Sequence, residues 1–306
     1  MKRIGIVVSM LWACGDVQEK PSNSSYSGPT SEPSSQTEGS DTGIGVDDEE
    51  DYCDYVFLLE RRVSGGGFVP YLWRFDPVTT NMVELGILDC PFSGFGDYLI
   101  AMTADQKGRL WFLSNEEYLF ISDPSTLECT ATNIEAFNFE EGIRSRSLAF
   151  MRTGEEAPDQ LFFSSYYSFS ANRQGVLTSL VQNELAVVGE IPGFVGNGAV
   201  MELAGSADGR IFGQSFAVGE SSHFVELDHY TGDVISDVEL GVESGNAFTF
   251  AIIDGYAWMF LSTGAGGVSE VFRYEPDLNE LEYVKTLNTT MLGSAAPTCS
   301  SGTNGS

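Results

Sequence analysis

Histidine is scarce in this sequence, with two residues in 306, and this scarcity limits the catalytic sites that the chain can build. A Ser-His-Asp or Cys-His arrangement would need His223 or His229, and both lie in strand and turn patterns typical of structural residues. The chain also lacks the G-x-S-x-G pattern of serine hydrolases and the H-E-x-x-H pattern of zinc proteases. The motifs therefore predict no catalytic residue, no metal ligand and no cofactor.

Basic residues are few: Lys and Arg number 15 against 44 Asp and Glu, which gives a formal net charge of −29. This excess of negative charge disfavours polyanionic partners, so we expect no nucleic acid to bind. Hydrophobic residues make up 42% of the chain and aromatic residues 12%, enough to build a packed core. The composition indicates a globular protein with an acidic surface.

Long hydrophobic runs are absent as well. The apolar stretch 4–13 follows Lys2 and Arg3 and has about half of the roughly 20 residues needed to cross a bilayer, which is typical of a signal segment. Residues 11–14, Leu-Trp-Ala-Cys, resemble the lipobox of bacterial lipoprotein signal peptides. The resemblance implies that Cys14 carries a lipid and becomes the first mature residue. The alternative is an ordinary secretory signal beside an unrelated cysteine.

Ser, Pro, Gly and acidic residues dominate the chain after Cys14, where there is almost nothing to bury. This composition is typical of disorder, so we interpret residues 14–52 as a lipidated cysteine followed by a disordered tether. We predict a signal peptide at 1–13, a folded domain at 53–300 and a disordered tail at 301–306. The protein would then be exported and held at the bacterial cell envelope by its lipid anchor alone.

Internal repeats indicate the fold of the remaining chain. An apolar strand, an acidic turn and a second strand recur in four segments: 71–88, 118–134, 223–240 and 271–287. Their turn acids are spaced by 47, 105 and 47 residues, and a divergent copy, 175–191, lies in the long gap. Another strand pair precedes four of the five units: 100–114, 148–165, 200–215 and 250–262. Four strands per repeat predict an all-β propeller with about five four-stranded blades.

The two ends of the domain complete one another. The first unit lacks an innermost strand, and residues 294–301 form a predicted strand without a partner, so their pairing would close the ring. Closure would place Cys53 beside Cys299. Four cysteines follow Cys14, an even number that suits disulfides and allows three pairings, of which we favour Cys53–Cys299 and Cys90–Cys129. A zinc site is the alternative, but these cysteines lack C-x₂₋₄-C spacing.

Several turns and hairpins carry a family resemblance. The turns "DPVTT", "DPST" and "DHYTG" and the hairpins "ADQKGRLW" and "SADGRIFG" resemble those of exported bacterial propellers of the YVTN, NHL and quinoprotein-like group, over about residues 54–300. In the Asp-Pro turns, Pro sets the backbone angle and the acid oxygen caps the chain two residues on. The resemblance implies an architecture and leaves the activity open.

The long connections between strands are expected on one face of the propeller, where variable loops commonly form binding sites. Three of them, 61–70, 135–145 and 164–174, carry most of the binding-face candidates, which are arginine, tyrosine and acidic residues: Arg61, Arg62, Glu140, Glu141, Arg144, Arg146, Tyr166, Tyr167 and Arg173. Arg and Tyr are common in recognition surfaces. The alternative is that the arginines pair with neighbouring acids and the aromatic residues cap the blades.

These observations favour a non-enzymatic binding or scaffold propeller. We expect a monomer whose partner is an envelope protein, a peptide or a glycan. The alternative is an enzyme of the lyase, hydrolase or quinone-dependent dehydrogenase type, with carboxylates such as Glu140 and Glu141 near the axis. A structural envelope component without a small ligand is a third possibility.

Overall fold

The computed structural model describes residues 52–65, 67–92, 96–138, 142–154, 158–168, 175–192, 200–216, 221–243, 245, 247–262 and 267–299. All of these belong to one compact unit, Glu49–Ser306. The predicted signal peptide, Cys14 and the tether lie outside the described residues, except for Tyr52 at the end of the tether. Glu140, Glu141 and Arg173 also lie outside them.

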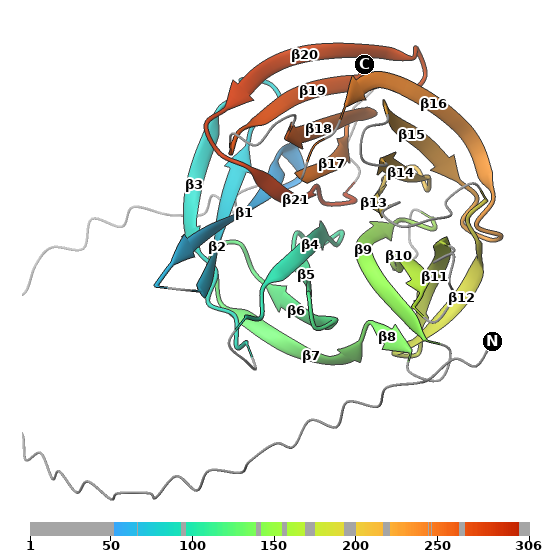
Figure 1. Cartoon of the computed structure of the whole chain (residues 1–306), viewed down its shortest axis with the longest axis horizontal. Helices are drawn as coiled ribbons and strands as arrows, with labels where there is room; N and C mark the ends of the chain where they lie inside the picture. Colours follow the sequence, from blue (N-terminus) through green and yellow to red (C-terminus); the bar gives the residue numbers. More distant parts are fainter. Residues whose placement is uncertain are drawn as a thin grey trace, which may run out of the picture. The chain divides into compact units, whose positions relative to one another are not determined.

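Five antiparallel sheets follow one another around a ring, with one short 3-10 helix, η1 (Tyr52–Asp54), before the first strand (Figure 1). We number the sheets as blades 1 to 5 and give each from its inner to its outer strand. Blade 1 contains β21 (Met291–Ala295), β1 (Val56–Ser64), β2 (Gly67–Phe75) and β3 (Met82–Ile87). Blade 2 contains β4 (Leu99–Ala104), β5 (Leu110–Ser114), β6 (Tyr118–Ser122) and β7 (Cys129–Glu135).

Blade 3 carries one strand more than the others. It contains β8 (Phe137–Asn138), β9 (Ile143–Met151), β10 (Gln160–Tyr167), β11 (Gly175–Val181) and β12 (Glu184–Glu190), where β8 is a two-residue addition that pairs with the start of β9. Blade 4 contains β13 (Val200–Gly205), β14 (Ile211–Phe216), β15 (Ser221–Leu227) and β16 (Val234–Glu243). Blade 5 contains β17 (Ala247–Ile253), β18 (Tyr256–Ser262), β19 (Ser269–Glu275) and β20 (Glu280–Leu287). The predicted five-bladed propeller is confirmed.

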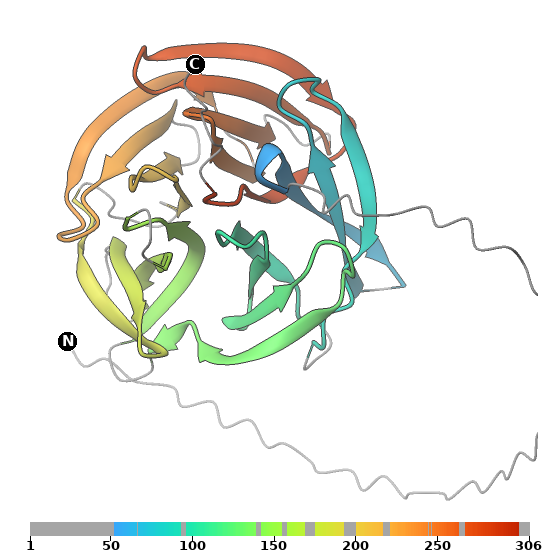
Figure 2. The same cartoon turned by 180° about the vertical axis from the view of Figure 1, so that it is seen from behind.

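The ring closes through both ends of the domain. Strand β21 pairs antiparallel with β1, from Phe57 opposite Ala295 to Glu60 opposite Met291, and the red β21 lies beside the blue β1 in both views (Figures 1 and 2). The closing strand begins three residues earlier than the predicted segment 294–301 and ends before Pro297. Proline has no N–H to donate to a strand ladder, which accounts for that end.

Both favoured disulfides are present. Cys53 in η1 is joined to Cys299 beyond the end of β21, with 5.8 Å between the Cα atoms. The sequence predicts both cysteines within the paired strands, but the structure places them just outside β1 and β21. The bond still ties the two ends of the ring together. Cys90 is joined to Cys129 and links the chain after β3 in blade 1 to the start of β7 in blade 2.

Among the described residues, the buried hydrophobic side chains form five clusters, each of them between two neighbouring blades. The cluster between blades 3 and 4, for example, packs Met151 and Leu177 against Leu203 and Ile211. Fully burying one such side chain contributes about 1.5–3 kcal/mol, so each blade depends on both neighbours. In the part of the chain that is described, no helix is long and apolar enough to span a membrane.

The turn chemistry is as expected from the sequence. Asp76 Oδ1 accepts hydrogen bonds from the backbone N–H of Val78 at 2.8 Å and of Thr79 at 3.1 Å. Asp228 caps its turn in the same way. These tight turns lie at one end of the strands, here called the short-turn face. The opposite end, where the inner strands begin, is called the long-loop face.

Candidate functional site

Six predicted binding-face residues are described, and all of them lie on strands at the long-loop face. Arg61 and Arg62 belong to β1, and the pairing of β1 with β2 continues past them to Ser64 opposite Gly67. The others belong to β9 and β10 of blade 3: Arg144, Arg146, Tyr166 and Tyr167. The prediction of loops at residues 61–62, 144 and 166–167 is therefore wrong. Because these residues are held in sheets, their side chains start from fixed backbone positions.

Arg62 is bound within its own blade. Its Nη2 atom lies 2.7 Å from Glu60 Oε2 and 2.8 Å from Glu84 Oε2, and its guanidinium lies 3.7 Å from the centre of the Tyr71 ring. Glu60 is 8% exposed. Burial acts to raise the pKa of Glu60, but hydrogen bonds from Arg62, Thr289 and Trp73 hold it below its usual value. Arg62 therefore neutralises a buried acid of blade 1.

Arg144 has a similar role between two blades. Its Nε atom lies 2.8 Å from Oε1 of Glu117, which is 2% exposed and precedes β6 of blade 2. Burial raises the pKa of Glu117, and the positive charges of Arg144 and Arg146 oppose that rise. Arg146 also donates a hydrogen bond of 2.9 Å from Nη2 to the Tyr166 hydroxyl. The ion pair of Arg144 with Glu117 ties blade 3 to blade 2, and the hydrogen bond of Arg146 joins β9 to β10 within blade 3.

Arg61 is placed differently. Its guanidinium carbon lies 4.5 Å from the centre of the Phe68 ring and 4.4 Å from the centre of the Tyr98 ring. The two rings meet edge to face with their centres 5.1 Å apart, so Arg61 covers both of them. Among the described residues, the acids that pair with Arg62 and Arg144 form no ion pair with Arg61.

An exposed apolar pair accompanies this cation. Val63 is 75% exposed and pairs directly with Phe68, which is 38% exposed, near the tip of the β1–β2 hairpin. Arg61 and Val63 lie on one face of β1 because side chains two residues apart share a face. We call Arg61, Val63, Phe68 and Tyr98 the hairpin-tip patch. Of these four residues the sequence predicts only Arg61 as a binding residue, although the alternation through Val63 could have shown that the strand continues.

Comparisons with known proteins give partial structural similarities and no match in sequence. No protein-family model matches the sequence, and no curated protein matches it. Among solved structures, an oligogalacturonate lyase from Vibrio parahaemolyticus is similar at 12% identity and a TM-score of 0.38, over 76% of this chain and 67% of that one. A protein of unknown function from Dyadobacter fermentans is similar at 6% identity and a TM-score of 0.45, over 76% and 83%. These likenesses carry no information about activity.

A buried polar group lies on the inner strands. Glu202 of β13 is 5% exposed, and its Oε1 atom lies 3.5 Å from the hydroxyl of Thr249, which is 2.8 Å from the hydroxyl of Ser294. Burial raises the pKa of Glu202 well above its usual value, and hydrogen bonds from Ser147 and Thr249 oppose the rise only in part. The described residues contain no cluster of three or more His, Cys, Asp or Glu residues arranged to hold a metal ion.

Proposed function

We propose that this protein is an exported, lipid-anchored monomer that binds a partner protein through the hairpin-tip patch. The observation that carries the proposal is the contact of Arg61 with Phe68 and Tyr98 beside the exposed Val63. Arginine and aromatic residues are enriched at protein interfaces, and residues fixed before binding lose less entropy on association. Arg61 is a cation held in place on a strand of a chain whose net charge is −29.

The chemistry of the patch favours a protein partner over a glycan. The guanidinium of Arg61 lies against both rings, and the rings meet edge to face, so these aromatic faces are already in contact. A sugar ring needs a free aromatic face to stack on. A partner that presents a carboxylate beside apolar side chains would pair with Arg61 and cover Val63 and Phe68. Such a pair would be stronger once water is excluded.

The cellular location rests on separate features. Two disulfides suit an oxidising compartment, and the lipobox resemblance of residues 11–14 supports export with a lipid on Cys14. Mass spectrometry of the intact mature protein tests this part of the proposal. We expect the mass of a chain that begins at Cys14 and carries acyl groups. A mature chain without acyl groups would contradict lipid anchoring and leave the binding proposal standing.

Site-specific photo-crosslinking in the source cells tests the binding face. A photoreactive residue replaces Val63 in one variant and, as the control, Val78 in another. Val78 is 91% exposed and lies in a turn on the short-turn face. We expect one discrete adduct from position 63, none from position 78, and loss of the adduct when Arg61→Ala is added. Identical adducts from both positions, or an adduct unaffected by Arg61→Ala, would contradict the proposal.

An enzyme is the second candidate, and Glu202 is the observation that favours it. A carboxyl whose pKa is raised by burial keeps its proton to a higher pH than an exposed one and is suited to donate it. Such an acid must also be reachable by a substrate. Labelling of the folded protein with a diazo reagent, followed by mass spectrometry, separates the two candidates. The binding proposal predicts that Glu202 stays unmodified until the protein is unfolded, whereas rapid labelling in the folded state would favour the enzyme.

A further inference from the structure

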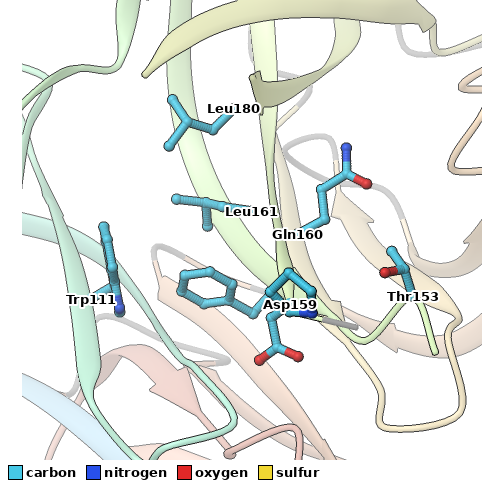
Figure 3. Close-up of a pocket in the computed structure, with 8 residues that line it drawn as sticks. Trp111, Thr153, Asp159, Gln160, Leu161 and Leu180 are labelled. Carbon is cyan, nitrogen blue, oxygen red and sulfur yellow. The ribbon is translucent and has the colours of Figure 1, made fainter. Parts of the chain in front are cut away.

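A pocket of about 370 Å³ opens on the short-turn face between blades 2 and 3, at the opposite strand ends from the hairpin-tip patch (Figure 3). Its walls come from β5, β9, β10 and β11 and from the residues between β9 and β10, and they include Trp111, Phe150, Asp159, Gln160, Leu161 and Leu180. This volume lies in the range of about 300–1,000 Å³ typical of small-ligand sites. The pocket is independent of the proposed function at the long-loop face.

The apolar walls are fixed by the core. Phe150 and Leu161 are 7% and 3% exposed and belong to the cluster between blades 2 and 3. The Trp111 ring meets the Phe150 ring edge-on, with centres 5.3 Å apart. The Trp111 Nε1 atom donates a hydrogen bond of 3.2 Å to Asp105, and this bond holds the indole in place. Leu161 and Leu180 add branched aliphatic surface that suits a methylene chain.

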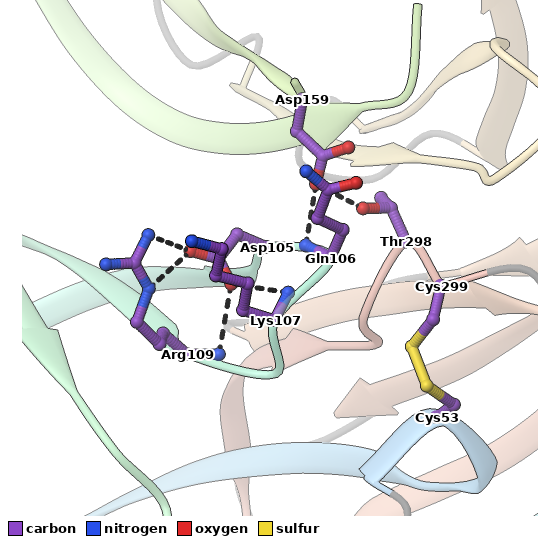
Figure 4. The surroundings of a disulfide bond; sticks show 8 residues. All are labelled: Cys53, Asp105, Gln106, Lys107, Arg109, Asp159, Thr298 and Cys299. Atoms are coloured by element: carbon purple, nitrogen blue, oxygen red, sulfur yellow. Dashed lines mark hydrogen bonds and ion pairs between the residues drawn. A yellow bond between two sulfur atoms is a disulfide. The ribbon is translucent and has the colours of Figure 1, made fainter. Parts of the chain in front are cut away.

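The polar end of the pocket is an incompletely bonded carboxyl. Asp159 Oδ2 accepts hydrogen bonds from the backbone N–H of Gln106, at 2.7 Å, and from the Thr298 hydroxyl (Figure 4). Its Oδ1 atom is buried and has no hydrogen-bond partner among the described residues. Burial raises the pKa of Asp159 and the nearby charge of Asp105 adds to the rise, while the hydrogen bonds from Thr298 and Gln106 and the charge of Arg152 oppose it in part. Asp105 itself is paired with Arg109 at 2.7 Å. A cation or a hydrogen-bond donor would therefore be favoured beside Asp159.

We propose that this pocket binds an alkylammonium group, the chemistry of a lysine side chain or of a free aliphatic amine. The methylene stem would lie along Leu161 and Leu180, and the ammonium group would reach the Trp111 ring and Asp159. An ammonium group is attracted to the face of a tryptophan ring and to a carboxylate. An anionic ligand would be repelled by Asp159. A sugar would bring several hydroxyls against leucine side chains that offer them no partner.

Calorimetric titration of the full mature protein tests the proposal. The probe is Nα-acetyl-lysine methylamide, and its matched control is Nα-acetyl-norleucine methylamide, which keeps the alkyl chain and lacks the ammonium group. We expect the lysine compound to bind at least 10-fold more tightly. Equal affinity of the two compounds, or binding of methyl glucoside in preference to both, would overturn the proposal. Butylammonium shows whether the natural ligand is a free amine or a lysine side chain. If butylammonium binds as tightly as the lysine compound, the ligand is a free amine; if it binds more weakly, the ligand is a polypeptide.

Variants locate the binding in this pocket. Asp159→Asn should weaken binding of the lysine compound at least 10-fold, whereas Glu184→Gln, an exposed acid on the same blade, should leave it within twofold. Because Asp159 also holds Thr298, a second variant covers the case in which Asp159→Asn does not fold. Gln160→Lys places a competing ammonium group at the pocket and should weaken binding at least 10-fold, with exposed Gln182→Lys as its control. Unchanged affinity in folded Asp159→Asn or Gln160→Lys would overturn the assignment.

Discussion

Asp159 of blade 3 accepts a hydrogen bond from Thr298, the residue next to Cys299 in the segment that closes the ring (Figure 4). The same oxygen accepts a hydrogen bond from the backbone of Gln106 in blade 2. Three blades therefore meet at one carboxyl on the short-turn face. This contact adds to the strand pairing of β21 with β1 and to the Cys53–Cys299 disulfide.

Thr298→Val should lower the free energy of unfolding by about 1 kcal/mol, because it keeps the shape of the 2%-exposed side chain and removes its hydrogen bond to a buried carboxyl. Urea unfolding measures the change. Thr130→Val is the control, since Thr130 is exposed on β7, and it should change stability by less than about 0.5 kcal/mol. A Thr298→Val protein as stable as the parent would show that this contact does not help to hold the closing segment.

The two disulfides should differ in their effect on stability. Cys53 and Cys299 are separated by 246 residues, and Cys90 and Cys129 by 39. In the chain-entropy model the longer loop corresponds to about 5.5 kcal/mol and the shorter to about 4 kcal/mol. Replacing each pair by serines and measuring unfolding should therefore show the larger loss for Cys53 and Cys299. The reverse order would mean that ring closure does not depend chiefly on the bond between the chain ends.

The buried Glu202 should make the free energy of unfolding fall as the pH rises. Its pKa in the folded protein is well above its usual value because it is buried, so the folded chain keeps a proton that the unfolded chain releases above about pH 4.3. The proton on Glu202 contributes fully to the free energy of unfolding below that pH. This contribution is lost as the pH rises towards the folded-state pKa, at about 1.4 kcal/mol per pH unit. Glu202→Gln has no such proton and should flatten the profile.

Urea unfolding between pH 4 and pH 8 measures this difference. Glu202→Gln should gain stability relative to the parent as the pH rises. Other groups with raised pKa values, Glu117 and Asp159, are present in both proteins and cancel in the comparison. The exposed Glu184→Gln is the control and should follow the parent. Parallel profiles for Glu202→Gln and the parent would contradict a buried, protonated Glu202.

Arg61 and Arg62 are neighbours in sequence and should differ in their effect on stability. Arg62→Ala removes the ion partner of Glu60, a buried acid, and should cost about 2 kcal/mol, less than for a fully buried pair because the Arg62 side chain is 36% exposed. Arg61→Ala removes a partly exposed cation that covers two rings and should cost about 1 kcal/mol or less. Urea unfolding of both variants measures the contrast. Equal losses would show that Arg61 is a structural residue like Arg62.

The division of the chain into four-stranded blades could be predicted from the sequence because the patterns that indicate strands and turns are local. Each capped turn depends on an acid and on the residues two or three positions later, as at Asp76 and Asp228. The three glycines among residues 61–70 predict a loop, whereas the structure forms a hairpin there. Gly65, with φ of +61°, lies in the tight turn, and Gly67 already begins β2.

The binding features depend on contacts between blades, which the sequence does not reveal. Glu117 and Arg144 are 27 positions apart and meet because blade 2 lies beside blade 3. Trp111 and Asp159 line one pocket for the same reason. Tyr98 reaches Arg61 from the start of blade 2, although no pattern in the sequence links the two. Repeats therefore predict the ring, and the packing of neighbouring blades determines its sites.

The most direct test of the proposed function is the affinity of the partner captured at position 63, measured by biolayer interferometry for the parent and two variants. Arg61→Ala should weaken binding at least 30-fold without a comparable loss of thermal stability. Val78→Ala, on the opposite face, should bind as the parent does. If Arg61→Ala binds as tightly as the parent, the hairpin-tip patch is not the recognition surface and the proposed function is wrong.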